Sequence, residues 1–206
     1  MNICVFLSAA ELDARYTDAA RELGRLIAAG GHTLVWGASE VGLMKVLADA
    51  VDAAGGRMIG ISVDFLASQA RTLHAPDEME IAANLAERKA AMLGRSDAVV
   101  IMVGGTGTLD EATEVLELRK HSLYTGPVVV LNTDGFYDGL QAQFTRMDAE
   151  GFLPVPLAQL CSFVDQPAQV LATIELSAAA SSAVSNSAAA SISDGTSRNS
   201  DPTPSD

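Results

Sequence analysis

The sequence predicts an α/β fold, a doubly wound parallel sheet within a single domain. Short apolar runs alternate along the chain with longer segments of helical period, and this alternation is typical of parallel strands joined by crossover helices. The apolar runs are continuous, as expected for strands that helices cover on both faces. Ligands bind beyond the carboxyl ends of the strands in open sheets of this kind, so the loops that follow the strands are the expected place for a functional site.

The first half of the chain contains three of the expected strands and two of the helices. In the first helix, apolar residues recur at helical spacing from Tyr16 to Ile27 and share one face. A pair of glycines ends each helix. The expected elements are a strand at 3–7, a helix that ends at Gly30, a strand at 33–36, a helix at 42–54 and a strand at 58–61.

The second half repeats the alternation and closes with a helix whose first residue, Pro167, suits a first helical turn. The expected elements are an irregular stretch at 62–77, a helix at 79–93, a strand at 98–102, a helix at 109–119, a strand at 128–131, a helix at 137–150, a short apolar segment at 160–164 and a helix at 167–176.

The C-terminal residues differ in composition from the rest. Residues 177–206 are mostly Ala, Ser, Asn, Asp, Thr and Pro, with almost no large apolar side chain. Such a segment buries too little surface to offset the entropy of ordering it, so we expect a disordered tail. Residues 1–176 then form the one domain, which is long enough to bury a sizeable core.

Composition also argues against several classes of partner. The net charge is -13 at pH 7 and the basic residues are scattered, so the chain is a poor candidate for binding nucleic acid. Its histidines are isolated and lack the spacing of metal ligands. The first residues indicate a strand instead of a signal peptide, and no apolar stretch is long enough for a membrane span. We expect a cytoplasmic protein, with Cys4 and Cys161 as buried thiols in a reducing compartment.

The most informative motif is a glycine turn at 104–108, between an expected strand and an expected helix. Its glycines leave backbone N–H groups accessible at the positive end of a helix, and Thr106 and Thr108 add hydroxyl donors. No lysine stands where a Walker A loop needs one, and the turn does not open the first strand–helix unit as a dinucleotide fingerprint does. The turn therefore predicts a phosphate site, for neither a magnesium-bound triphosphate nor NAD.

Two charged segments, one in the helix that follows this turn and one upstream of it, allow either a structural or a functional interpretation. Glu111 lies one turn into the expected helix, where it would place a carboxylate beside a bound phosphate or, like Asp110, only stabilise the helix dipole. Upstream, Glu87-Arg88-Lys89 taken alone is typical of a solvated helix face. Sequence spacing does not say how far Arg88 lies from Glu111 in space.

Together these segments resemble the paired signature of the LONELY GUY proteins, a family also described as lysine decarboxylase-like. The family has an Arg-Lys pair upstream of Pro-Gly-Gly-x-Gly-Thr-x-x-Glu, matched here by Arg88-Lys89 and by residues 104–111. Gly42-Leu43-Met44 and the segment 132–137 also resemble family motifs. The similarity extends over residues 2–176.

The resemblance implies a Rossmann-like fold, at least a homodimer, and cytokinin riboside 5′-monophosphate phosphoribohydrolase activity. The reaction would cleave the N-glycosidic bond of an N6-substituted adenosine monophosphate and release the free base and ribose 5-phosphate, with no metal or other cofactor. Arg88 and Glu111 would be catalytic: Glu111 would stabilise an oxocarbenium-like centre or orient water, and Arg88 would orient Glu111 or the ribose hydroxyls. The expected substrate-binding residues are Ser8, Gly42, Met44, Lys89, Gly104, Gly105, Thr106, Gly107 and Thr108.

The chain departs from the family pattern in several loops. Residues 7–10 read Leu-Ser-Ala-Ala where the family has Cys-Gly-Ser-Ser, residues 37–39 read Gly-Ala-Ser in place of three glycines, and Val103 replaces a proline. Added Cβ atoms in loops that approach a nucleotide change the shape of its pocket. The leading hypothesis covers plain AMP as well as N6-substituted nucleotides. Two other hypotheses stay open: a nucleotide-binding or sensing protein with weak or no turnover, and a glycosidase for a different nucleoside monophosphate.

Overall fold

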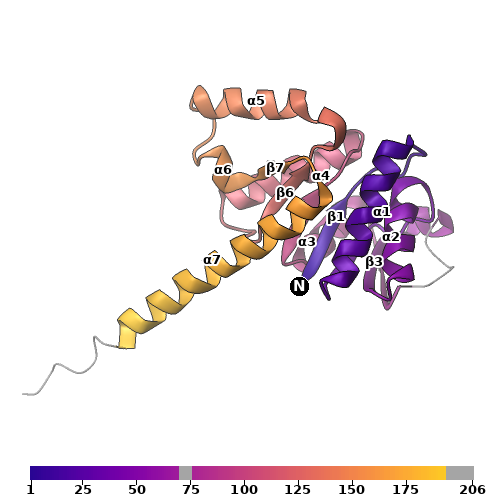
Figure 1. Ribbon diagram of the computed structural model, residues 1–206, viewed down its shortest axis with the longest axis horizontal. Coiled ribbons are helices and arrows are strands. Elements are labelled where there is room, and N and C mark those ends of the chain that lie inside the picture. Colours follow the sequence, from indigo (N-terminus) through magenta and orange to yellow (C-terminus); the bar gives the residue numbers. More distant parts are fainter. Residues whose placement is uncertain (70–75, 194–206) are drawn as a thin grey trace, which may run out of the picture.

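The structure is a computed structural model that describes residues 1–69 and 76–193 (Figure 1). At its centre is a seven-stranded sheet of order β4-β3-β2-β1-β5-β6-β7, in which every pair of neighbours is parallel. The α/β prediction is confirmed. The strands are β1 Asn2–Phe6, β2 Thr33–Trp36, β3 Arg57–Val63, β4 Glu78–Ala82, β5 Ala98–Ile101, β6 Val128–Leu131 and β7 Ser162–Val164.

Helices cover both faces of the sheet, so the fold is doubly wound. One hydrophobic core joins the sheet to α1, α2 and α7, and a second joins the opposite face to α3, α4, α5 and α6. The helices are α1 Ala14–Ala29, α2 Gly42–Ala53, α3 Leu85–Gly94, α4 Thr106–Lys120, α5 Asp138–Ala149, α6 Leu157–Leu160 and α7 Pro167–Ser193, with 3₁₀ turns η1 Asp64–Gln69 and η2 Thr133–Gly135.

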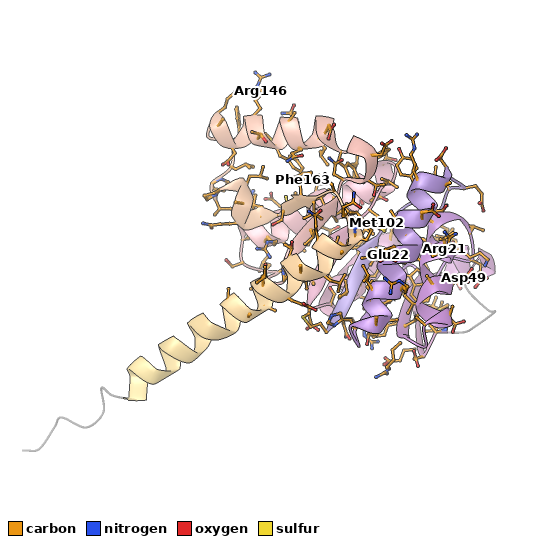
Figure 2. All side chains as sticks on the ribbon, in the orientation of Figure 1. Arg21, Glu22, Asp49, Met102, Arg146 and Phe163 are labelled. Atoms are coloured by element: carbon orange, nitrogen blue, oxygen red, sulfur yellow. The ribbon has the colours of Figure 1, made fainter. Side chains whose placement is uncertain are left out.

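Most apolar side chains are buried between the sheet and the helices, and most charged side chains point outward (Figure 2). Met102, which follows β5, is fully buried between the layers, whereas Arg146 extends outward from α5. Cys4 and Cys161 are buried free thiols, as expected. Within the described residues, every helix is too short or too polar to pass through a lipid bilayer.

The chain order of the strands reverses between β1 and β5, which pair at the middle of the sheet. From β1 the chain proceeds to β2 on one side, and β5 is followed by β6 on the other. At such a reversal the connections leave in opposite directions, and a crevice opens at the carboxyl ends of the strands. A hydrogen bond of 3.1 Å from the Ser8 amide to the Val103 carbonyl joins the two loops that flank this crevice.

The expected helix at 79–93 is wrong in its first half, because β4 occupies Glu78–Ala82 and α3 begins only at Leu85. In this edge strand Met79 and Ile81 alternate with two glutamates, and almost the whole strand is exposed. Helix α3 begins where the side chain of Asn84 accepts a hydrogen bond from the Glu87 amide.

The last helix does not end at Leu176, where we expected it to, but continues to Ser193. Alanine is the best helix former, and the extension is rich in it. In Figure 1 this part of α7 projects away from the sheet. The division of the chain into a domain at 1–176 and a disordered tail stays a prediction, and residues 194–206 of that tail lie outside the described residues.

Candidate active site

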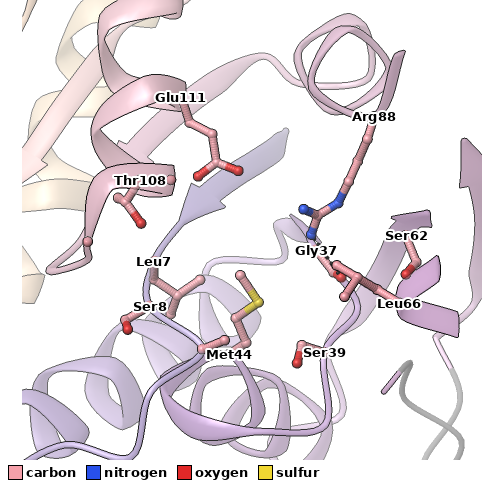
Figure 3. A pocket seen from close by; sticks show the side chains of 13 residues that line it. Leu7, Ser8, Gly37, Ser39, Met44, Ser62, Leu66, Arg88, Thr108 and Glu111 are labelled. Atoms are coloured by element: carbon pink, nitrogen blue, oxygen red, sulfur yellow. Dashed lines mark hydrogen bonds between the residues drawn. The ribbon is translucent and has the colours of Figure 1, made fainter. Parts of the chain in front are cut away.

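A pocket of about 270 Å³ lies at the carboxyl edge of the sheet, at the reversal point between β1 and β5 (Figure 3). Loops after β1 and β2, the end of β3, and helices α2, α3 and α4 all contribute to its wall. The lining residues are Leu7, Ser8, Ala9, Gly37, Ser39, Met44, Ser62, Leu66, Arg88, Gly105, Gly107, Thr108 and Glu111.

The glycine turn supplies the N-terminus of α4, which starts at Thr106, inside the motif and earlier than the sequence indicated. Gly105 occupies the N-cap and offers no side-chain hydrogen bond, whereas Asp13 and Asn84 cap α1 and α3. The first turn of α4 carries no acidic residue either. Its backbone N–H groups therefore keep their positive potential for a ligand in the pocket.

Glycine is required at position 104 by close packing within the turn. A Cβ atom there would lie 2.1 Å from Oγ1 of Thr108. The buried Thr108 side chain therefore packs against Gly104 within the turn, and Thr108 also lines the pocket.

Arg88 enters the pocket from α3 and is 8% exposed. Its Nε donates to the Ile61 carbonyl at 2.9 Å and its Nη2 to the Gly37 carbonyl at 3.0 Å. A Cβ on Gly37 would lie 1.8 Å from Nη2, so glycine at that position makes room for the guanidinium. Burial lowers the pKa of Arg88, and the nearby Glu111 carboxylate opposes the shift.

Glu111 projects into the same pocket from α4 and faces Arg88 across it (Figure 3). Burial raises the pKa of its carboxyl to about 7, against the attraction of the Arg88 guanidinium. Among the described residues the two groups form no direct ion pair, so space for a substrate remains between them. A half-ionised carboxyl opposite a fixed cation suits acid–base or electrostatic catalysis near neutral pH.

The structure brings many of the expected site residues together and places others outside the pocket. Both expected catalytic residues line it, as do Ser8, Met44, Gly105, Gly107 and Thr108. The expected contacts that do not line it are Gly42, Lys89, Gly104 and Thr106.

Two of the outlying residues have other surroundings. Gly42 adopts a positive φ of +57°, and a Cβ there would lie 2.2 Å from the Ala9 carbonyl oxygen, so it lets the loop after β1 pass α2. Lys89 has its ammonium group between two carboxylates of α4, those of Asp110 and Glu114.

Six residues line the pocket without having been named as site residues, namely Leu7, Ala9, Gly37, Ser39, Ser62 and Leu66. Ser62 follows the expected third strand, so the rule that ligands bind beyond strand ends points to it. Leu66 lies in a 3₁₀ turn, and no sequence pattern distinguishes it. The loop at 132–135 also follows a strand, yet it contributes no wall to this pocket. The described residues contain no cluster of three His, Cys, Asp or Glu side chains arranged to hold a metal ion.

Sequence comparison relates the chain to proteins of named activity. A family model described as "Possible lysine decarboxylase" matches residues 44–174. The probable cytokinin riboside 5′-monophosphate phosphoribohydrolase LOGL9 of Oryza sativa is 39% identical over 153 residues, which cover 74% of this chain and 67% of the relative. The probable enzyme LOG6 of Arabidopsis thaliana, with the same activity in its name, is 35% identical over 153 residues, which cover 74% and 76%.

Solved structures share the fold at lower identity. The molybdenum cofactor binding protein of Rippkaea orientalis aligns with a TM-score of 0.64 at 24% identity and covers 84% of this chain and 94% of its own. The Moco carrier protein of Chlamydomonas reinhardtii aligns with a TM-score of 0.65 at 24% identity and covers 86% and 97%. At these identities the likeness concerns the fold alone.

Proposed function

We propose that this chain, which belongs to the LONELY GUY family of cytokinin riboside 5′-monophosphate phosphoribohydrolases, hydrolyses the N-glycosidic bond of adenosine 5′-monophosphates. N6-substituted nucleotides and plain AMP are the proposed substrates. The observation that carries the proposal is one pocket that combines an uncapped helix N-terminus with an arginine and a carboxyl on opposite sides. The helix N-terminus suits a 5′-phosphate, and the arginine and the carboxyl suit a ribose that lies between them.

In the proposed reaction the bond between C1′ of the ribose and the base nitrogen breaks with both electrons passing to the base. A water molecule adds its oxygen to C1′, one of its protons is lost, and the base gains a proton. The products are free base and ribose 5-phosphate. Positive charge develops on the sugar before water adds, and the ionised Glu111 would stabilise it.

Arg88 is held for this task by two backbone carbonyls, which fix its guanidinium without neutralising it. Its Nη1 donates no hydrogen bond within the described part of the chain, so it is available to a ribose hydroxyl or to Glu111. The N–H groups of Gly105 and Gly107, with the Thr108 residue, would bind the phosphate, while Ser8 and Met44 would contact the rest of the nucleotide. Gly42, Gly104 and Thr106 would act by shaping these loops.

We also propose a homodimer, which the family implies. Three apolar side chains on β4 and at the start of α3 are 42–50% exposed, namely Met79, Ile81 and Leu85. A second copy that covers this edge would bury them. Light scattering after size-exclusion chromatography measures the mass, and a monomer at micromolar concentration would contradict the proposal.

Release of free base from AMP and from isopentenyladenosine monophosphate tests the activity. We expect release from at least one nucleotide and a loss of about 10²-fold or more in Glu111→Ala and in Arg88→Ala. Glu117→Ala, on the exposed part of the same helix, is the matched control and should retain full activity. Binding of both nucleotides without release of base would replace the proposal with a nucleotide-sensing role.

A further inference from the structure

Lys89 joins the two helices that carry the proposed catalytic residues. It follows Arg88 on α3, and its Nζ lies 2.7 Å from Oδ2 of Asp110, the residue before Glu111 on α4. The same ammonium group contacts the Glu114 carboxylate, one turn further along α4. The Lys89 side chain is only 17% exposed, whereas its partners Asp110 and Glu114 are 65% and 35% exposed, so the pairs lie at the surface with the ammonium on their inner side.

Helix α3 packs mainly on β3 and β4, so the Lys89 ammonium adds a direct link to α4 beside the hydrophobic core that the two helices share. Asp110 and Glu114 stand four residues apart on α4, where two like charges repel each other. The Lys89 ammonium compensates both carboxylates at once and attracts α4 towards α3. Both carboxylates raise the pKa of Lys89, which keeps its charge at neutral pH.

We propose that Lys89, Asp110 and Glu114 form an ionic clamp in which Lys89 is a positioning residue that sets the separation of Arg88 and Glu111 across the pocket. The consequence for catalysis rests on the proposed function, whereas the clamp itself concerns only the geometry of α3 and α4. A direct contact between Lys89 and the substrate is not part of it, since Lys89 lies outside the pocket wall.

The clamp also acts on the charge of Glu111. Burial raises the pKa of Glu111 to about 7, Arg88 and Lys89 of α3 lower it, and Asp110 and Glu114 of its own helix raise it. Cys4 of β1 and Tyr137 after η2 also face Glu111, and burial raises the pKa of both, so they are neutral near pH 7. Arg88 and Lys89 are the two cations that lower the pKa of Glu111. Loss of the Lys89 ammonium should therefore raise that pKa further.

A ¹³C NMR titration of the Glu111 carboxyl tests the clamp without reference to activity. The Glu111→Gln variant assigns the resonance. In Lys89→Met the pKa of Glu111 should rise by about half a unit, and in Lys89→Arg it should stay at the wild-type value. Lys120→Met is the matched control, because Lys120 pairs with Glu117 within α4 and bridges no second helix.

An unchanged titration of Glu111 in Lys89→Met would overturn the clamp. If that variant does not fold, Lys89→Gln removes the charge and retains an amide donor on a side chain that is one bond shorter, and the same criterion applies. A shift of equal size in Lys120→Met would also overturn the clamp, since any loss of a cation would then have the same effect.

The base-release assay separates positioning from substrate binding. A positioning role predicts that Lys89→Met lowers kcat about tenfold, changes KM less than about twofold, and is rescued by arginine. A raised KM at unchanged kcat would show a direct contact with substrate and overturn the role assigned here. Absence of base release from the wild-type protein would overturn the proposed function, and the NMR titration would still decide the clamp.

Discussion

Glu111 combines two properties that oppose each other, a buried position and a charge that the proposed chemistry needs. Burial raises its pKa to about 7, and Arg88 and Lys89 only partly offset that shift. The protein therefore keeps a carboxyl whose ionised form is less favourable in the folded state than in water. Sites that need such groups lower folding stability, and the cost is measurable as a dependence on pH.

The direction of that dependence follows from the two pKa values. Glu111 titrates near 4.5 when unfolded and near 7 when folded, so between these values the folded state binds more protons and stability falls as pH rises. Glu111→Gln should therefore raise the free energy of unfolding at pH 8 by up to about 3 kcal/mol and change it little at pH 4. Urea denaturation at both pH values measures the difference. An equal gain at both would show that the titration of Glu111 is not its cause.

Tyr137 forms a hydrogen bond just beyond the end of β5, next to the glycine turn. Its buried hydroxyl donates to the Met102 carbonyl at 2.8 Å, and the Gly104 amide lies close enough to lower its pKa against the effect of burial. Tyr137→Phe leaves that carbonyl without its donor, so we expect a loss of about 1–3 kcal/mol in stability and a higher KM for the 5′-monophosphate. Urea denaturation and the base-release assay measure the two effects.

Tyr124→Phe is the matched control for this prediction. The Tyr124 hydroxyl donates at 3.5 Å to the Ser96 carbonyl, just before β5 and at the opposite end of that strand from the pocket. Its removal should cost less stability and leave KM unchanged. A rise in KM of the same size in both variants would mean that loss of any buried hydroxyl disturbs the site.

At the scale of single residues, the sequence predicted which side chains carry the chemistry better than it predicted the contacts that those side chains make. The glycine turn and the Glu111 carboxylate follow from a local pattern, and the structure places both at one pocket. The long-range contacts of Arg88 do not follow from it, because they depend on how β2 and β3 align beside α3. The environment of Lys89 was missed for the same reason: its partners lie on another helix.

Among the secondary-structure elements, the end of α4 offers a test of backbone strain. Ser122 follows the C-cap His121 and has φ +58°, a conformation that costs residues with a Cβ about 1 kcal/mol or more. The exposed Ser122→Gly variant should gain about 1 kcal/mol in the free energy of unfolding, as measured with urea. Ser122→Ala retains the Cβ and should gain nothing, so a gain of equal size there would rule out backbone strain as the cause.

Element order was predictable to the extent that each element carries its own apolar pattern. β2 and β6 were predicted with the bounds they have, because four consecutive buried or half-buried residues form each strand. β4 was missed because it is an edge strand with little buried surface of its own, and its alternating residues run directly into the helical pattern of α3. Pairing with β3, which is not visible locally, is what makes it a strand.

At the scale of the whole molecule, the first part of α7 packs in the hydrophobic core. Val170, Leu171 and Ile174 are buried in the core that α1 and α2 share, whereas the helix beyond them projects away from the sheet. Each of the three side chains contributes about 1.5–3 kcal/mol by burial. Together they contribute about 4.5–9 kcal/mol, which is comparable to the total stability of about 5–15 kcal/mol that is typical of a domain, so we expect the fold to be lost when all three are removed.

A chain truncated after Ala180 should therefore melt within about 2 °C of the full-length protein, while one truncated after Gln169 should show no cooperative transition. Circular dichroism during heating measures both, and the base-release assay should show equal activity for the full-length and Ala180 chains. A lower melting temperature in the Ala180 chain would place the domain boundary further along α7 than the burial of its side chains indicates. The buried side chains of α7 pack on the face of the sheet that α1 and α2 cover, and none of them lines the pocket at its carboxyl edge. Any loss of activity should therefore follow from the loss of folding.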